Sequence, residues 1–135
     1  MNGDRASRTD RWVVVAGVTL VLAAVFFSMA ASRTVDQDEG FSIVSAGMAL
    51  DGKLPYRDFF YQQMPLPLYV YGSWMKVFGE TWLSARFLSA LFAVALGLLV
   101  FFHARRATGR RSLALLAAGL FAFSSAAGGW YTVVK

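Results

Sequence analysis

A run of 20 predominantly apolar residues, Trp12 to Ala31, most constrains how this chain can fold. As a helix, at about 1.5 Å per residue, the run would be about 30 Å long, which matches the hydrocarbon core of a bilayer. Within lipid, a single segment can satisfy its own backbone hydrogen bonds only as a helix. The run therefore predicts a transmembrane helix, and two further apolar stretches, at about 82–103 and 113–131, predict two more.

The overall composition agrees with a membrane protein. Hydrophobic residues make up 57% of the 135 residues and charged residues 16%, and the mean hydropathy is +0.51. Soluble domains are roughly 45–50% apolar. The chain contains no cysteine, which excludes disulfides, thiol nucleophiles and thiolate metal sites. We predict an all-α integral membrane protein with three transmembrane helices.

The distribution of positive charge predicts the topology. The formal charge is +5, but seven of the 13 lysines and arginines crowd into two short segments. These are Arg5, Arg8 and Arg11 before the first span, and Arg105, Arg106, Arg110 and Arg111 between the second and third. Such clusters at span ends are typical of cytoplasmic segments and not of a nucleic-acid surface. We expect a multi-pass protein of the plasma or inner membrane with a cytoplasmic N-terminus, an external loop at 32–81, and no nucleic-acid partner.

The N-terminus also fits a second pattern. Arginines, an apolar stretch and then Ser28-Met29-Ala30 resemble a secretory signal with a small-residue cleavage site. The apolar run is longer than the roughly 7–15 residues of a signal core. A retained membrane anchor is therefore the favoured interpretation.

The external loop is predicted to contain two short interfacial helices. Apolar residues at helical spacing indicate a helix at about 39–50, and Gly52 and Pro55 follow as stop signals. A second helix should begin near Pro65 or Pro67 and end at Phe78-Gly79. Its tyrosines and tryptophan favour the membrane interface, so we expect it to lie along the membrane.

An acidic cluster follows the first span. Asp36, Asp38 and Glu39 begin five residues after Ala31, which places them at a membrane surface. Charge is costly near lipid, so such a cluster is a candidate for chemistry. Acidic residues at this position also serve as caps and favourable charges at the start of a following helix.

The order of these features resembles the GT-C membrane glycosyltransferases. Asp38-Glu39, Gly52-x-x-Pro55-Tyr56-Arg57-Asp58, Pro65 to Tyr69, Phe78-Gly79 and Ala85-Arg86 follow one another as in the protein mannosyltransferase and aminoarabinose transferase branch. The resemblance implies a transferase that moves a sugar from a polyprenyl-phosphate donor to an acceptor on the extracytoplasmic face. It also implies that the Asp-Glu or Asp-x-Asp motif of the first external loop falls on Asp38-Glu39 or Asp36-x-Asp38.

The chemistry gives the carboxylates separate roles. Phosphate is already a good leaving group, so the incoming hydroxyl is the group that needs a general base. A single base with direct displacement would invert the anomeric centre, by analogy with inverting glycosidases. Adjacent helical residues point about 100° apart, so we assign Asp38 as the base and Glu39 as an orienting or acceptor-binding group. Asp36 is a further substrate-binding candidate, and it could also hold a divalent cation, whose ligands there would be oxygens alone.

Three more residues are candidate substrate contacts. Arg57 and Asp58 could contact carrier phosphate or sugar, and the alternative is a surface ion pair or turn. Arg86, in the first turn of the second span, could face phosphate or could snorkel to lipid headgroups. Gln62, Gln63 and Met64 stand before Pro65-Leu66-Pro67, where the family would place charged residues. Any basic phosphate contact is therefore left to Arg57 or Arg86.

The length of the chain leaves two functional classes. Enzymes of the resembled family have more spans, so we interpret the chain as the N-terminal portion of a larger transferase whose partners are membrane lipid, the lipid-linked donor and further helices. No cofactor is implied. The alternative is a small three-span protein with a structural or helix-binding role, favoured by small residues at four-residue spacing. These residues are Ser89, Ala93 and Gly97.

Overall fold

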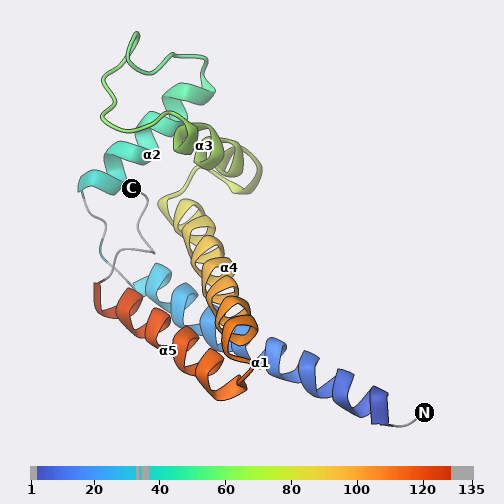
Figure 1. Cartoon of the computed structure of the whole chain (residues 1–135). Coiled ribbons are helices and arrows are strands. Elements are labelled where there is room, and N and C mark those ends of the chain that lie inside the picture. Colours follow the sequence, from blue (N-terminus) through green and yellow to red (C-terminus); the bar gives the residue numbers. More distant parts are fainter. Residues whose placement is uncertain (1–2, 33, 35–36, 129–135) are drawn as a thin grey trace.

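The computed structural model describes residues 3–32, 34 and 37–128. All of its regular elements are helices, as Figure 1 shows. They are α1 (Gly3–Ser32), α2 (Gln37–Leu50), α3 (Leu66–Phe78), α4 (Trp82–Thr108) and α5 (Arg111–Gly128). Three segments are long and apolar enough to cross a membrane: Asp10–Ser32, Trp82–Thr108 and Arg111–Gly128. The prediction of an all-α protein with three candidate spans is confirmed.

Helix α4 extends five residues beyond its predicted end. It begins after Thr81, whose side chain accepts a hydrogen bond of 3.1 Å from the Ser84 backbone N–H. At the other end Arg105 and Arg106 continue the helix, since arginine is a good helix former. Gly109 ends it with a left-handed backbone at φ 69°. The predicted end of the third span, at residue 131, lies outside the described residues.

Helix α4 packs against both α1 and α5 and forms the centre of the three-helix bundle in Figure 1. Ser89, Ala93 and Gly97 are all buried, as the small-residue spacing predicts. At Gly97 a Cβ atom would lie only 2.8 Å from the Leu22 side chain. A side chain at this position would therefore require the Leu22 side chain to shift.

Helices α2 and α3 form a second packing unit at the N-terminal end of α4 (Figure 1). The two predicted helices of the loop are confirmed, with bounds within two residues of those expected. The pair is held by a small apolar core of Ala46, Ala49, Tyr61, Leu68, Met75 and Ala85. At Gly72 a Cβ would lie 2.9 Å from Leu50 and 3.1 Å from the Ala46 carbonyl oxygen. Whether this unit lies along the membrane stays a prediction.

Candidate functional site

A buried ion pair joins the two packing units. The Arg86 Nε and Nη2 atoms on α4 each donate a 2.6 Å hydrogen bond to the Glu39 carboxylate on α2, one to each oxygen. Both side chains are 0% exposed. This two-point geometry is the strongest form of the arginine–carboxylate interaction. It fixes the first turn of α2 against the first turns of α4.

The rest of the guanidinium reaches the end of α1. Arg86 Nη1 donates to the Ala30 carbonyl at 3.2 Å, and Nη2 donates to the Thr34 carbonyl at 2.8 Å. The last carbonyls of a helix lack partners within the helix and carry partial negative charge. The ring of Trp82 lies 4.8 Å from the guanidinium carbon, close enough for a cation–π contact. One arginine thus joins the end of α1 and the starts of α2 and α4.

Asp38 has the opposite environment to its neighbour. It lies in the first turn of α2, where the helix dipole favours a negative charge. Its side chain is exposed, whereas Glu39 is buried. Within residues 37–128 the Asp38 carboxylate has no hydrogen-bond or ion-pair partner. The helical geometry therefore separates an exposed carboxylate, without a partner in the part of the chain that the structure describes, from a buried one whose two oxygens both accept from Arg86.

Polar contacts from α3 surround the start of α4. The Tyr71 hydroxyl lies 2.8 Å from Ser89 Oγ, and Trp74 Nε1 donates to the Ser84 carbonyl at 2.9 Å. Burial raises the pKa of Tyr71, as does the Glu39 charge, while the bond to Ser89 acts in the opposite direction. Sequence reasoning missed the tyrosine as part of this region. Its partner lies on another helix, and no local pattern marks such a contact.

Arg57 and Asp58 form an exposed pair in the loop between α2 and α3. Arg57 Nε donates to Asp58 Oδ1 at 2.9 Å, and Asp58 Oδ2 accepts from the Leu54 backbone N–H at 2.8 Å. The hydrogen bond from Arg57 holds the pKa of Asp58 below its usual range, and the bond from Leu54 adds to this effect. The geometry is that of a turn closed by an ion pair. Among the described residues, no hydrogen bond or ion pair links this turn to Asp38, Glu39 or Arg86.

One expectation about the site is wrong, and another stays a prediction. Arg86 does not extend toward headgroups, because its guanidinium is buried and bonded to Glu39. The sequence could not anticipate this, since the partner carboxylate is far away along the chain. Asp36 lies outside the described residues. No group of three metal-ligating side chains comes together in the part of the chain that the structure describes.

Comparison with known families gives the class of this protein, a membrane glycosyltransferase of the GT-C type. The matching family model is that of the dolichyl-phosphate-mannose-protein mannosyltransferases; it covers residues 57–127, just over half of the chain, and the chain belongs to this family. No curated protein and no solved structure matches the chain. The matched segment contains Arg57, Asp58 and Arg86, whereas Asp38 and Glu39 precede it.

Proposed function

We propose that this chain forms the acceptor-activating part of a transferase that moves a sugar from a polyprenyl-phosphate donor to a hydroxyl on the extracytoplasmic face, with Asp38 as general base. The proposal rests on one observation: two adjacent carboxylates have different environments. Asp38 is exposed and free of partners among the described residues, whereas both Glu39 oxygens accept from Arg86. A general base must reach the hydroxyl proton within hydrogen-bond distance.

Glu39 and Arg86 have a positioning role in this proposal. Their ion pair sets where the first turn of α2 begins relative to α1 and α4. Asp38 is the residue before Glu39, so the pair also fixes the backbone that carries the base. A rigid support of this kind matters because small displacements of a catalytic group cost large factors in rate. Glu39 is thus an orienting group and not an acceptor ligand.

The carrier phosphate needs a cation, and the exposed Arg57 is the better candidate of the two arginines. Its side chain is 71% exposed, against 0% for Arg86. A phosphate at Arg86 would have to displace Glu39 from a buried, two-point contact. Arg57 is held by two exposed hydrogen bonds to Asp58, which a phosphate could replace at little cost because the pair is solvated. Asp58 would then be free to accept from a sugar hydroxyl.

Direct displacement by a base-activated hydroxyl gives inversion at the anomeric carbon. The bond from that carbon to the carrier phosphate oxygen breaks as the bond to the acceptor oxygen forms, and Asp38 takes the proton. We infer that the N-terminus is cytoplasmic, which puts the loop that carries Asp38 on the extracytoplasmic face.

The test measures sugar transfer in membranes that contain the full-length protein. Lipid-linked sugars, dolichyl-phosphate mannose among them, are offered as donors to Asp38→Asn and to Asp51→Asn. Asp51 is an exposed carboxylate beyond the opposite end of α2, so its variant matches the loss of charge. We expect Asp38→Asn to lower transfer by about 100-fold or more and Asp51→Asn to leave it unchanged. Equal transfer by the two variants would remove Asp38 from the base role.

A further inference from the structure

A basic pocket lies at the other end of the bundle from the Glu39–Arg86 pair. It has a volume of about 320 Å³ and receives one arginine from each spanning helix: Arg11 from α1, Arg105 from α4 and Arg111 from α5. Arg105 follows Arg86 by 19 residues along α4, which is about 28 Å of helix. The pocket is therefore separate from the proposed transfer site, at the opposite end of the candidate spans.

One of the arginines that line the pocket has an unused hydrogen-bond donor. Arg105 Nη1 is buried and has no hydrogen-bond partner among the residues that the structure describes. Within the same part of the chain, no carboxylate forms an ion pair with Arg11, Arg105 or Arg111. Three converging positive charges repel one another, and a buried N–H without an acceptor is unfavourable. An anion with several oxygens would offset the charge repulsion and supply hydrogen-bond acceptors. Phosphate is favoured among such anions, because planar guanidinium groups match the geometry of its oxygens.

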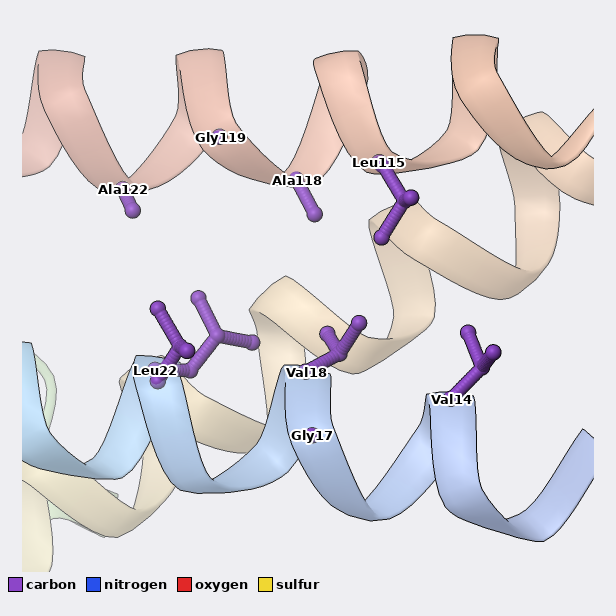
Figure 2. A pocket seen from close by; sticks show the side chains of 9 residues that line it. Val14, Gly17, Val18, Leu22, Leu115, Ala118, Gly119 and Ala122 are labelled. Atoms are coloured by element: carbon purple, nitrogen blue, oxygen red, sulfur yellow. The ribbon is translucent and has the colours of Figure 1, made fainter.

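An apolar groove continues from the basic pocket between α1 and α5. Figure 2 shows side chains of the two helices facing each other across it. The groove has a volume of about 350 Å³, and Val14 lines both the groove and the basic pocket. It is open partly because Gly17 and Gly119 leave space where other residues would place side chains. Arg111 in the pocket and Leu115 in the groove are one turn apart on α5.

We propose that this pocket and groove bind one anionic phospholipid. The phosphate lies among Arg11, Arg105 and Arg111, and an acyl chain occupies the groove between α1 and α5. The order of the two regions matches that of a lipid molecule, because the charged pocket lies at the ends of the candidate spans and the apolar groove extends along their length. A free phosphate would use the arginines but would gain nothing from the groove.

The first experiment compares two neighbouring arginines. The whole chain is purified in detergent and mixed with phosphatidylglycerol or with phosphatidylcholine of identical acyl chains, and bound lipid is counted by native mass spectrometry. Arg105→Gln removes a pocket charge, and Arg106→Gln removes the adjacent exposed charge, which does not line the pocket.

We expect phosphatidylglycerol to be retained in preference to phosphatidylcholine. Loss of a charge-assisted hydrogen bond should lower its affinity about tenfold in Arg105→Gln, with little change in Arg106→Gln. Equal retention of the two lipids, or equal effects of the two substitutions, would overturn the proposal.

The second experiment separates a lipid from a free phosphate. Glycerol phosphate is added as a competitor, and Gly119→Leu is used to fill the groove without altering the arginines. We expect Gly119→Leu to weaken phosphatidylglycerol binding and glycerol phosphate to compete only at far higher concentration than the lipid. Competition by glycerol phosphate at the same concentration would assign the pocket to free phosphate. Phosphatidylglycerol binding that is insensitive to Gly119→Leu would show that no acyl chain occupies the groove and leave it to another protein segment.

Discussion

Arg86 on α4 and Glu39 on α2 meet through two 2.6 Å hydrogen bonds although they are 47 residues apart in the sequence. The contact is buried at the junction of three helices, and it therefore decides how the α2–α3 unit is placed on the spanning bundle. In a low-dielectric setting, such a pair is costly to form and far more costly to break on one side only.

Removing the charge of Glu39 should destabilise the fold strongly. Glu39→Gln keeps the shape of the side chain but leaves the buried Arg86 charge without its counterion, so we expect a loss of about 3–5 kcal/mol in the free energy of unfolding. The measurement is an unfolding titration in mixed detergent micelles. Glu80→Gln is the matched control, because Glu80 is exposed and forms no ion pair among the described residues. Similar losses in both variants would mean that the pair is not a stabilising contact.

The destabilising effects of substituting Glu39 and Arg86 should not be additive. Glu39→Gln combined with Arg86→Gln removes both charges, so no unpaired buried charge remains. We expect the double variant to be less destabilised than the sum of the two single variants, by about 1–3 kcal/mol. Additive losses in the unfolding titration would contradict direct coupling between these residues.

Gly72 should tolerate no side chain. Gly72→Ala places a methyl group 3.1 Å from the Ala46 carbonyl oxygen and 2.9 Å from Leu50, and overpacking of this kind costs about 1–3 kcal/mol. Gly47→Ala on the facing helix meets nothing within 4 Å and should stabilise α2 by about 0.5–1 kcal/mol, since alanine favours a helix more than glycine does. The two variants should therefore shift the thermal midpoint in opposite directions. A shift of the same sign would contradict the close α2–α3 packing.

The Tyr71 hydroxyl should contribute to stability. Tyr71→Phe removes its 2.8 Å hydrogen bond with Ser89 and should cost about 0.5–1.5 kcal/mol. Ser89 Oγ keeps its bond to the Ala85 carbonyl, so the loss should not be larger. Tyr69→Phe, at an exposed position of the same helix, is the control. Unfolding free energies that are equal for the two variants would contradict this contact.

Asp58 should titrate below the usual range of aspartate. The bond from Arg57 is the main cause of the lowered pKa, so Arg57→Gln should raise the pKa of Asp58 toward its ordinary value. A lowered carboxyl pKa in the folded state stabilises the turn above the ordinary pKa of aspartate, and this contribution is lost as the pH falls through the lowered pKa. The carbon-13 shift of the Asp58 carboxyl, followed against pH, measures the pKa of Asp58 in the unaltered protein and in Arg57→Gln. Identical titrations with and without Arg57 would contradict the pairing.

The main elements of the fold were predictable from local sequence. The length of the apolar runs predicts the spans, and the turn residues around Pro65 and Gly79 predict the bounds of α3 to within a residue or two. The extension of α4 to Thr108 was missed, since the charged Arg105 and Arg106 suggest the end of a span but do not end a helix. Hydrophobicity predicts which residues lie in lipid, whereas the helix itself continues until Gly109, whose left-handed backbone ends it.

The candidate site was predictable only in part. The separation of Asp38 from Glu39 follows from the 100° step of a helix and needs no partner. The sequence left open which of the two carboxylates would be buried and what would neutralise it. Arg86 was therefore expected to face headgroups or phosphate, and in the structure its guanidinium donates to Glu39 and to the carbonyls of Ala30 and Thr34.

The sequence by itself determined that this chain forms membrane-length helices and carries carboxylates after the first of them, because the length and polarity of a segment are local properties. Only the tertiary structure decided that Glu39 is held by Arg86, whereas Asp38 has no partner among the described residues, and that Arg11, Arg105 and Arg111 line one pocket. These contacts join residues on different helices. Their geometry depends on how small residues such as Gly97 let the helices approach, and no periodicity within a single segment encodes it.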